Sequence, residues 1–195
     1  DCECDEELVA YRYALTGERV ETVRKGQAPE TLLYDGAHAM ITLDSTGQAV
    51  ALRQQGAGWD EWTIVAERSP ETEGPPVVRY PLTEGQGTLM GAADEQGALV
   101  QQVSYDPWGM PLSDVQGTAS GAVALPGFQG HLYEPGTGLY DLRARWYDPA
   151  LGRFISPDPV RTPYNPAGLN PYAFGMNNPL RYTDPTGEVI VVSFV

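Results

Sequence analysis

The sequence has few of the residues on which most binding and catalytic sites depend. It has 12 basic residues against 26 acidic ones, so a surface that binds nucleic acid or an anionic membrane is not expected. No apolar run reaches the roughly 18 residues of a membrane span. The first residues include neither a basic nor an apolar segment, so no signal peptide is expected, and the start without Met suggests a piece of a longer chain.

Cysteine and histidine are equally scarce. Cys2 and Cys4 are too few for a disulfide scaffold, and a frayed terminus is favoured over a soft-metal site because further ligands at a known spacing are missing. His38 and His131 are the only histidines, and no Ser/His or Cys/His arrangement, phosphate-binding loop or HExxH motif accompanies them. We therefore expect neither a metal nor a cofactor.

Glycine and proline, in contrast, are abundant, with 22 and 17 residues. Apolar residues recur about two apart in the stretches 38–44 and 98–106, whereas no stretch keeps a helical period over several turns. Short strands joined by many turns explain both features. The predicted fold is all-β, built from sequential antiparallel hairpins.

A short phrase recurs along the chain, in which Asp is followed three residues later by Gly, or four residues later in its longer form. An Asp side chain can accept a hydrogen bond from the backbone two residues on, and Gly supplies a left-handed residue at the end of a hairpin turn. The Asp residues are therefore predicted to form turns rather than to catalyse, and several of the glycines should have positive φ. The predicted turn residues are Asp44 and Gly47, Asp94 and Gly97, Asp106 and Gly109, and Asp148 and Gly152.

Aromatic residues are dense in the stretch 139–159, "LYDLRARWYDPALGRFISPDP". Tyr and Phe next to turn phrases suit the half-buried face of a strand, so packing between neighbouring repeats is favoured over binding of sugar rings. The predicted packed centre consists of Tyr133, Tyr140, Trp146, Tyr147, Phe154 and Tyr172. The alternative is a surface module that binds glycan or another cell through Trp59, Trp62, Trp108 and Trp146.

Three phrases occur in a specific order: "YDPWG" (105–109), "GFQGHLYEPGTGLYDLRARWYDPALGRFISPDP" (127–159) and "LNPYAFGMNNPLRYTDPTG" (169–187). Together they resemble the Rhs repeat-associated core domain of Rhs and YD-repeat proteins, which is shared with the C components of insecticidal toxin complexes. Residues 1–104 resemble ordinary YD repeats more loosely, residues 105–187 match the core domain, and residues 188–195 form an apolar tail toward a variable C-terminal region.

The resemblance implies a ribbon of β-strands that spirals into a hollow shell, with the core domain curling inward to close one end. Such a shell encloses and delivers a C-terminal toxin. The implied partners are the rest of the shell and the C-terminal effector domain, with secretion-apparatus proteins as further candidates. The implied location is secreted or on the surface of a bacterial cell, as part of a larger exported protein.

In several members of this family the core is also an aspartyl autoprotease. By resemblance Asp158 is the better candidate for the essential acid, and Asp184 is either the second carboxylate or part of the turn that presents the cut. The resemblance also implies a recognition phrase, "PLRYTDPTG" (179–187). Scission would fall just after it, behind Glu188, and would leave a fragment beginning at Val189. Two carboxylates a few ångströms apart, one protonated, are needed.

Two departures from the family pattern count against cleavage. Glu188 stands where cleaving members have an apolar residue, and burying its charge unpaired would be costly. The link in residues 160–168 is also longer and richer in proline than the usual Gly-rich link. We therefore expect an intact chain through Val195. The apolar stretch 189–195 should be buried in a sheet or covered by a continuation of the chain, because such a segment left exposed aggregates.

Overall fold

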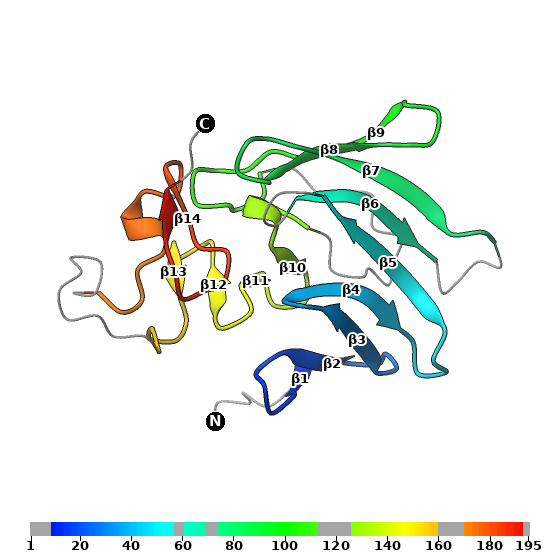
Figure 1. Ribbon diagram of the computed structural model, residues 1–195, viewed down its shortest axis with the longest axis horizontal. Helices are drawn as coiled ribbons and strands as arrows, with labels where there is room; N and C mark the ends of the chain where they lie inside the picture. The colour runs from blue at the N-terminus through cyan, green and yellow to red at the C-terminus, as the bar shows by residue number, and fades with distance from the viewer. Residues whose placement is uncertain (1–8, 57–60, 69–73, 113–125, 160–169, 193–195) are drawn as a thin grey trace, which may run out of the picture.

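The computed structural model describes residues 9–56, 61–68, 74–112, 126–159 and 170–192. Cys2, Cys4 and Trp59 lie outside these residues. The described chain is almost entirely β-structure, with only short 3₁₀ turns, so the prediction of an all-β fold is confirmed (Figure 1).

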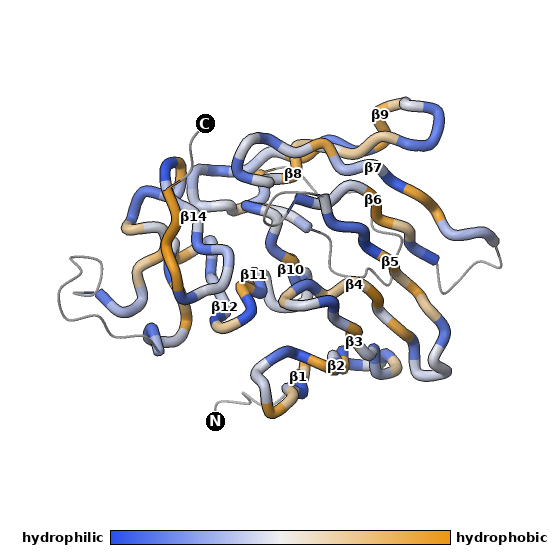
Figure 2. The backbone as a smooth tube through the Cα atoms, in the orientation of Figure 1, coloured by the Kyte–Doolittle hydropathy of each residue, from blue (hydrophilic) through white to orange (hydrophobic). Residues whose placement is uncertain are grey.

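The first part of the chain forms one nine-stranded sheet, which we call the hairpin sheet. Its strands are β1 (Val9–Tyr13), β2 (Arg19–Arg24), β3 (Glu30–Asp35), β4 (His38–Leu43), β5 (Ala49–Gln55), β6 (Trp62–Glu67), β7 (Val77–Thr83), β8 (Leu89–Ala93) and β9 (Leu99–Gln102). Each strand pairs antiparallel with the next, so the spatial order equals the sequence order. Hydrophobic and hydrophilic residues follow one another over short distances along these strands (Figure 2).

The turn phrases form local hydrogen-bonded turns. Asp44 Oδ1 accepts from the backbone N–H of Thr46 at 2.8 Å and of Gln48 at 3.0 Å. The carboxylates of Asp94, Asp106 and Asp148 likewise accept from the N–H two residues on, at 2.9, 2.9 and 2.8 Å. The four glycines of these phrases have φ of +83°, +78°, +86° and +65°. In each phrase the donor and the acceptor lie within one turn, which explains why this geometry can be predicted from the sequence.

Two of these glycines differ in what surrounds them, which gives a testable prediction. A Cβ at Gly47 would meet nothing within 4 Å, whereas one at Gly109 would overlap the ring of Phe128. We expect Gly47→Ala to destabilise by about 1 kcal/mol through backbone strain, and Gly109→Ala to cost clearly more because Phe128 must move. Urea denaturation measures both. Equal costs at the two sites would contradict the packing of Phe128 on Gly109.

Residues 103–112 follow β9 as a further turn, and the described residues from 126 to 192 form the core region. A four-stranded sheet contains β10 (Leu132–Glu134), β11 (Leu139–Asp141), β12 (Trp146–Asp148) and β13 (Arg153–Phe154), and a two-stranded sheet pairs β14 (Tyr182–Thr183) with β15 (Val191–Val192). The 3₁₀ turns η1 (Phe128–Gly130) and η3 (Gly175–Asn177) complete it. In Figure 1 the core region lies at one end of the hairpin-sheet strands.

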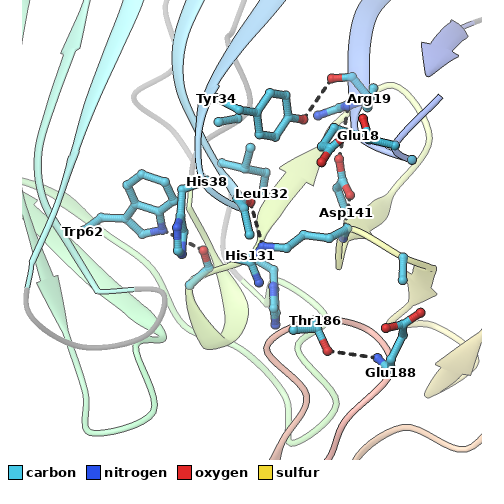
Figure 3. Close-up of a pocket in the computed structure, with 17 residues that line it drawn as sticks. Glu18, Arg19, Tyr34, His38, Trp62, His131, Leu132, Asp141, Thr186 and Glu188 are labelled. Atoms are coloured by element: carbon cyan, nitrogen blue, oxygen red, sulfur yellow. Dashed lines mark hydrogen bonds and ion pairs between the residues drawn. The ribbon is translucent and has the colours of Figure 1, made fainter. Parts of the chain in front are cut away.

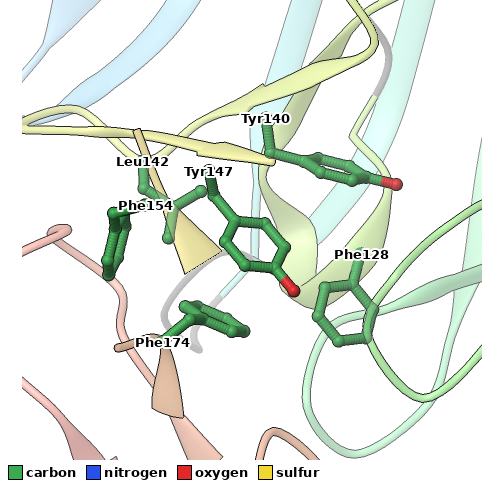
Figure 4. Packing of buried hydrophobic residues seen from close by; sticks show 6 residues of the cluster. All are labelled: Phe128, Tyr140, Leu142, Tyr147, Phe154 and Phe174. Atoms are coloured by element: carbon green, nitrogen blue, oxygen red, sulfur yellow. The ribbon is translucent and has the colours of Figure 1, made fainter. Parts of the chain in front are cut away.

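An aromatic cluster fills the core region (Figure 4). Its buried members are Phe128, Tyr140, Leu142, Tyr147, Phe154 and Phe174, and Tyr133 packs against them. Phe128, Leu142 and Phe174 were not predicted, and two predicted residues lie outside the cluster. Tyr172 is 36% exposed and does not belong to the packed centre. Trp146 points to the hairpin sheet instead, where its ring stacks on Tyr11 with centroids 4.7 Å apart.

The apolar tail is less covered than its sequence leads one to expect. Val191 and Val192 form β15 and pair with β14, so one edge of β15 has backbone hydrogen-bond partners. Val189, Val191 and Val192 are nevertheless 57%, 47% and 43% exposed. The expected burial is therefore not found in the described part of the tail, because a two-stranded ribbon has no second layer against which to pack.

Candidate functional site

Both candidate carboxylates meet at one guanidinium, that of Arg145. Arg145 Nη2 lies 3.2 Å from Asp158 Oδ2 and 3.3 Å from Asp184 Oδ2. The Arg145 side chain is 2% exposed, and its guanidinium carbon lies 3.6 Å from the centroid of the Phe154 ring. The structure thus brings Asp158 and Asp184 together, and it adds a cation that the sequence analysis did not single out.

Arg145 also holds the backbone of the recognition phrase. Its Nε donates to the carbonyl oxygen of Gly187, and its Nη1 donates to that of Pro171 at 3.2 Å. Gly187 has φ of +74°, and a Cβ there would overlap the carbonyl oxygen of Leu142. Only glycine fits this close approach without a shift of the backbone.

Asp184 contacts the peptide bond at which the resemblance would place scission. The residue is fully buried, and its Oδ1 accepts from the N–H of Val189 at 3.0 Å. Burial raises the pKa of Asp184 above its usual range, against the opposing charge of Arg145 and the N–H of Val189. A carboxyl group beside the leaving nitrogen is where a general acid would have to stand.

Arg145 opposes protonation of the pair in this arrangement, although burial outweighs its effect at Asp184. A guanidinium that bonds to both carboxylates favours two anions, whereas aspartyl catalysis needs one proton on the pair. Burial lowers the pKa of Arg145, and Asp158 and Asp184 oppose that shift. Arg145, Asp158 and Asp184 therefore form an ion triad that fixes the recognition phrase, and the two candidate carboxylates lie near each other.

The Glu188 side chain is not desolvated, whereas its position in the sequence suggested that its charge would be buried. It is exposed, and its N–H donates to Thr186 Oγ1 at 3.3 Å. The expectation of an unpaired buried charge is thus wrong for the structure shown. Glu188 instead acts on its surroundings through its negative charge, which raises the pKa of Arg145 against the lowering effect of burial.

A second ion network joins the core region to the hairpin sheet. Glu134, on β10, is 1% exposed and accepts from Arg24 Nε at 2.9 Å and Nη2 at 2.8 Å. Arg19 approaches Glu134 at 3.8 Å and Asp141 at 3.1 Å. Although burial opposes it, Glu134 and Glu30 raise the pKa of Arg24 above its usual value. These paired charges orient the core region on β2.

An interface cavity of about 410 Å³ lies beside this network (Figure 3). Turns of the hairpin sheet line one side of it, and the core region lines the other. Its lining includes Tyr34, His38, Trp62, His131, Arg143 and Glu188. The cavity thus extends from the seat of the core region to the recognition phrase.

The tryptophans of the alternative binding module are engaged in packing where the structure describes them. Trp62 is 3% exposed, and its indole N–H donates to Gly130 O at 2.7 Å. Trp146 stacks on Tyr11 and donates to the Tyr13 hydroxyl at 2.8 Å. Trp108 is half-buried. These rings do not form an open platform for a sugar.

Within the described ranges no group of three or more His, Cys, Asp or Glu side chains could hold a metal ion. No helix in the part of the chain that the structure describes has the length and apolar character needed to cross a membrane.

A meander of hairpins with an aromatic core region packed at its end defines a shell-forming repeat protein. The chain belongs to the Teneurin YD-shell family, whose model matches residues 78–180, more than half of its 195 residues.

Individual relatives agree with this assignment. The chain is 37% identical over 108 residues to "Toxin protein Tse5" of Pseudomonas aeruginosa, covering 55% of this chain and 8% of that protein. It is 29% identical over 180 residues to "Probable deoxyribonuclease RhsB" of Dickeya dadantii, covering 91% of this chain and 12% of that protein. The resemblance to Rhs and YD-repeat shells is thereby confirmed.

A solved structure shows the same fold. The structure described as "TcdB2-TccC3-Cdc42" superposes with a TM-score of 0.70 at 23% identity, over 92% of this chain and 9% of that one. The chain therefore spans about a tenth of the length of each of these three proteins.

Proposed function

We propose that this chain is the closing segment of a shell that encloses a C-terminal effector domain until delivery. The observation that carries the proposal is the seat of the core region, where buried Glu134 and partly buried Arg24 join β10 to the end of β2. A bidentate ion pair fixes orientation as well as distance. The core region is thus held rigidly against the hairpin sheet, as the end closure of a hollow shell requires.

The proposal assigns a role to each part of the chain. Residues 1–104 are wall, residues 105–187 are the closure, and residues 188–195 lead toward the effector. The partners are the rest of the shell and the effector itself, in a protein that a bacterium exports. Relatives named as a toxin and as a deoxyribonuclease support an effector of this kind.

Protease protection of the effector tests this function. The full-length protein and its isolated effector domain are digested side by side under native conditions. We expect the enclosed effector to resist a protease that cuts the isolated domain within minutes, because a closed wall excludes the enzyme. Equal rates of digestion would contradict enclosure.

A second candidate function is a single cleavage of the chain after Glu188. The contact between Asp184 Oδ1 and the N–H of Val189 favours it, because it places a carboxyl group at the leaving nitrogen. The negative charge of Glu188 opposes it. That charge lies next to the carbonyl group at which a further negative charge would develop during attack.

Mass spectrometry of a chain extended beyond Val195 distinguishes the outcomes. We expect the unchanged sequence to stay intact and Glu188→Leu to yield a fragment that begins at Val189. Asp158→Asn in the Glu188→Leu background should abolish that fragment, since the amide removes an ionisable oxygen at constant shape. An intact Glu188→Leu chain would contradict the second function, and cleavage of the unchanged chain would show that Glu188 is no barrier.

A further inference from the structure

Both histidines of the chain line the interface cavity, one from each side. His38 lies on β4 of the hairpin sheet, and His131 lies between η1 and β10 of the core region (Figure 3). Trp62 links them: its ring packs edge-on to His38 with centroids 6.0 Å apart, and its indole donates to the carbonyl of Gly130, the neighbour of His131. The only side chains that normally change charge between pH 5 and 8 thus stand where the two parts of the protein meet.

His131 is fixed in this position by its backbone. Its N–H donates to Phe128 O at 3.1 Å, and its carbonyl oxygen accepts from Gly127 N at 2.8 Å. The next residue, Leu132, packs with Leu32 and Ala39 of the hairpin sheet. The imidazole belongs to a residue that is only 4% exposed, so a movement of the core region away from the sheet would expose it to bulk water.

The charged groups around the cavity come from three further segments. The turn before β2 and the first residue of β2 contribute Glu18 and Arg19, the end of β11 and the turn after it contribute Asp141 and Arg143, and Glu188 follows the recognition phrase. Asp141 already pairs with Arg19 at 3.1 Å, while Glu18 is partly and Glu188 more fully exposed to solvent. An imidazolium at position 131 would lose most of its solvation in its buried site, in a cavity that two guanidinium groups and three carboxylates also line.

We propose that this interface is an acid-sensitive latch: protonation of His131 loosens the core region from the hairpin sheet. In the closed state the imidazole is neutral and buried. In the open state it is charged and hydrated, so lower pH favours opening, by up to about tenfold per pH unit for each proton taken up. Whether this movement also opens a shell depends on the function proposed above, whereas the latch itself does not depend on it.

The test follows the Trp62 indole N–H in the 195-residue chain by NMR, since this proton is bonded across the interface. Its exchange with solvent, corrected for the intrinsic pH dependence, is compared at pH 7.5 and pH 5.5. We expect protection to fall at least about tenfold in the unchanged protein and to stay nearly constant in His131→Gln, which keeps a polar side chain but does not titrate.

Two results would overturn the latch. One is an unchanged protection of Trp62 at pH 5.5, and the other is an equal loss in His131→Gln, which would assign the effect to carboxylates such as Glu18 or Asp141. If His131→Gln does not fold, the unchanged protein alone decides: the imidazole of His131 and the indole of Trp62 must respond with the same pH midpoint. Because no effector is present, failure here leaves the proposed enclosure untouched.

Discussion

Replacing Glu134 with Ala should destabilise the protein by about 3 kcal/mol, because it removes the buried carboxylate that Arg24 and Arg19 share. Glu134 accepts two hydrogen bonds from Arg24 and lies 3.8 Å from Arg19, whose side chain is 2% exposed. Arg24 would keep Glu30 and Arg19 would keep Asp141, so each guanidinium loses one of its two carboxylates. Urea denaturation of the 195-residue chain measures the loss.

Glu21→Ala is the matched control for this variant. Glu21 also pairs with an arginine, since Arg12 Nε lies 3.1 Å from its carboxylate, but the Arg12 side chain is 79% exposed. Such surface pairs contribute at most about 1 kcal/mol. A cost for Glu134→Ala as small as that of the control would show that the core region is not seated through this network.

Tyr147→Ala should cost about 3–5 kcal/mol, as expected for the loss of a fully buried aromatic side chain. Its ring lies 4.2 Å from that of Phe174, centroid to centroid, and its hydroxyl donates to Trp108 O at 2.7 Å. The substitution removes the centre of the aromatic cluster and one link to the turn at Trp108. Chemical denaturation again gives the magnitude.

Two further variants separate the contributions at this position. Tyr147→Phe keeps the ring and removes only the hydroxyl, so a loss of about 1 kcal/mol is expected. Tyr172→Ala changes an aromatic residue that is 36% exposed and should cost little. If Tyr172→Ala proved as costly as Tyr147→Ala, the assignment of the packed centre would be wrong.

The sequence predicts those features of the fold whose causes are local. An Asp that caps its own turn and a Gly at positive φ need only a few consecutive residues, so the turns at Asp44 and Asp94 follow from the phrase itself. Strand alternation is equally local. The hairpin meander could therefore be predicted from sequence, because each strand pairs with its neighbour along the chain.

The features that depend on distant residues could not be predicted in this way. Tyr140 and Tyr172 look alike as aromatics beside turn phrases, and only the packing of the core region decides that one is buried and the other exposed. Phe128 and Phe174 also belong to the cluster, and they were not predicted because their burial depends on the same packing.

The ion pairs of the core region show the same limit. Asp158 and Asp184 were identified through family resemblance, but the sequence does not indicate that Arg145 binds both. The pairing of Glu134 with Arg24 joins residues far apart in the chain and has no local signal. The alternating Arg residues of "LRARWYD" were the one available hint that a cation lies in the core region.

The central claim is that this chain closes a shell around an effector. Electron cryo-microscopy of the full-length protein tests it most directly. The account predicts a hollow, closed wall in which the hairpin sheet is continuous with upstream strands, with the core region plugging one end and residues beyond Val195 inside. An open sheet with the core region detached, or an effector located outside the wall, would contradict it.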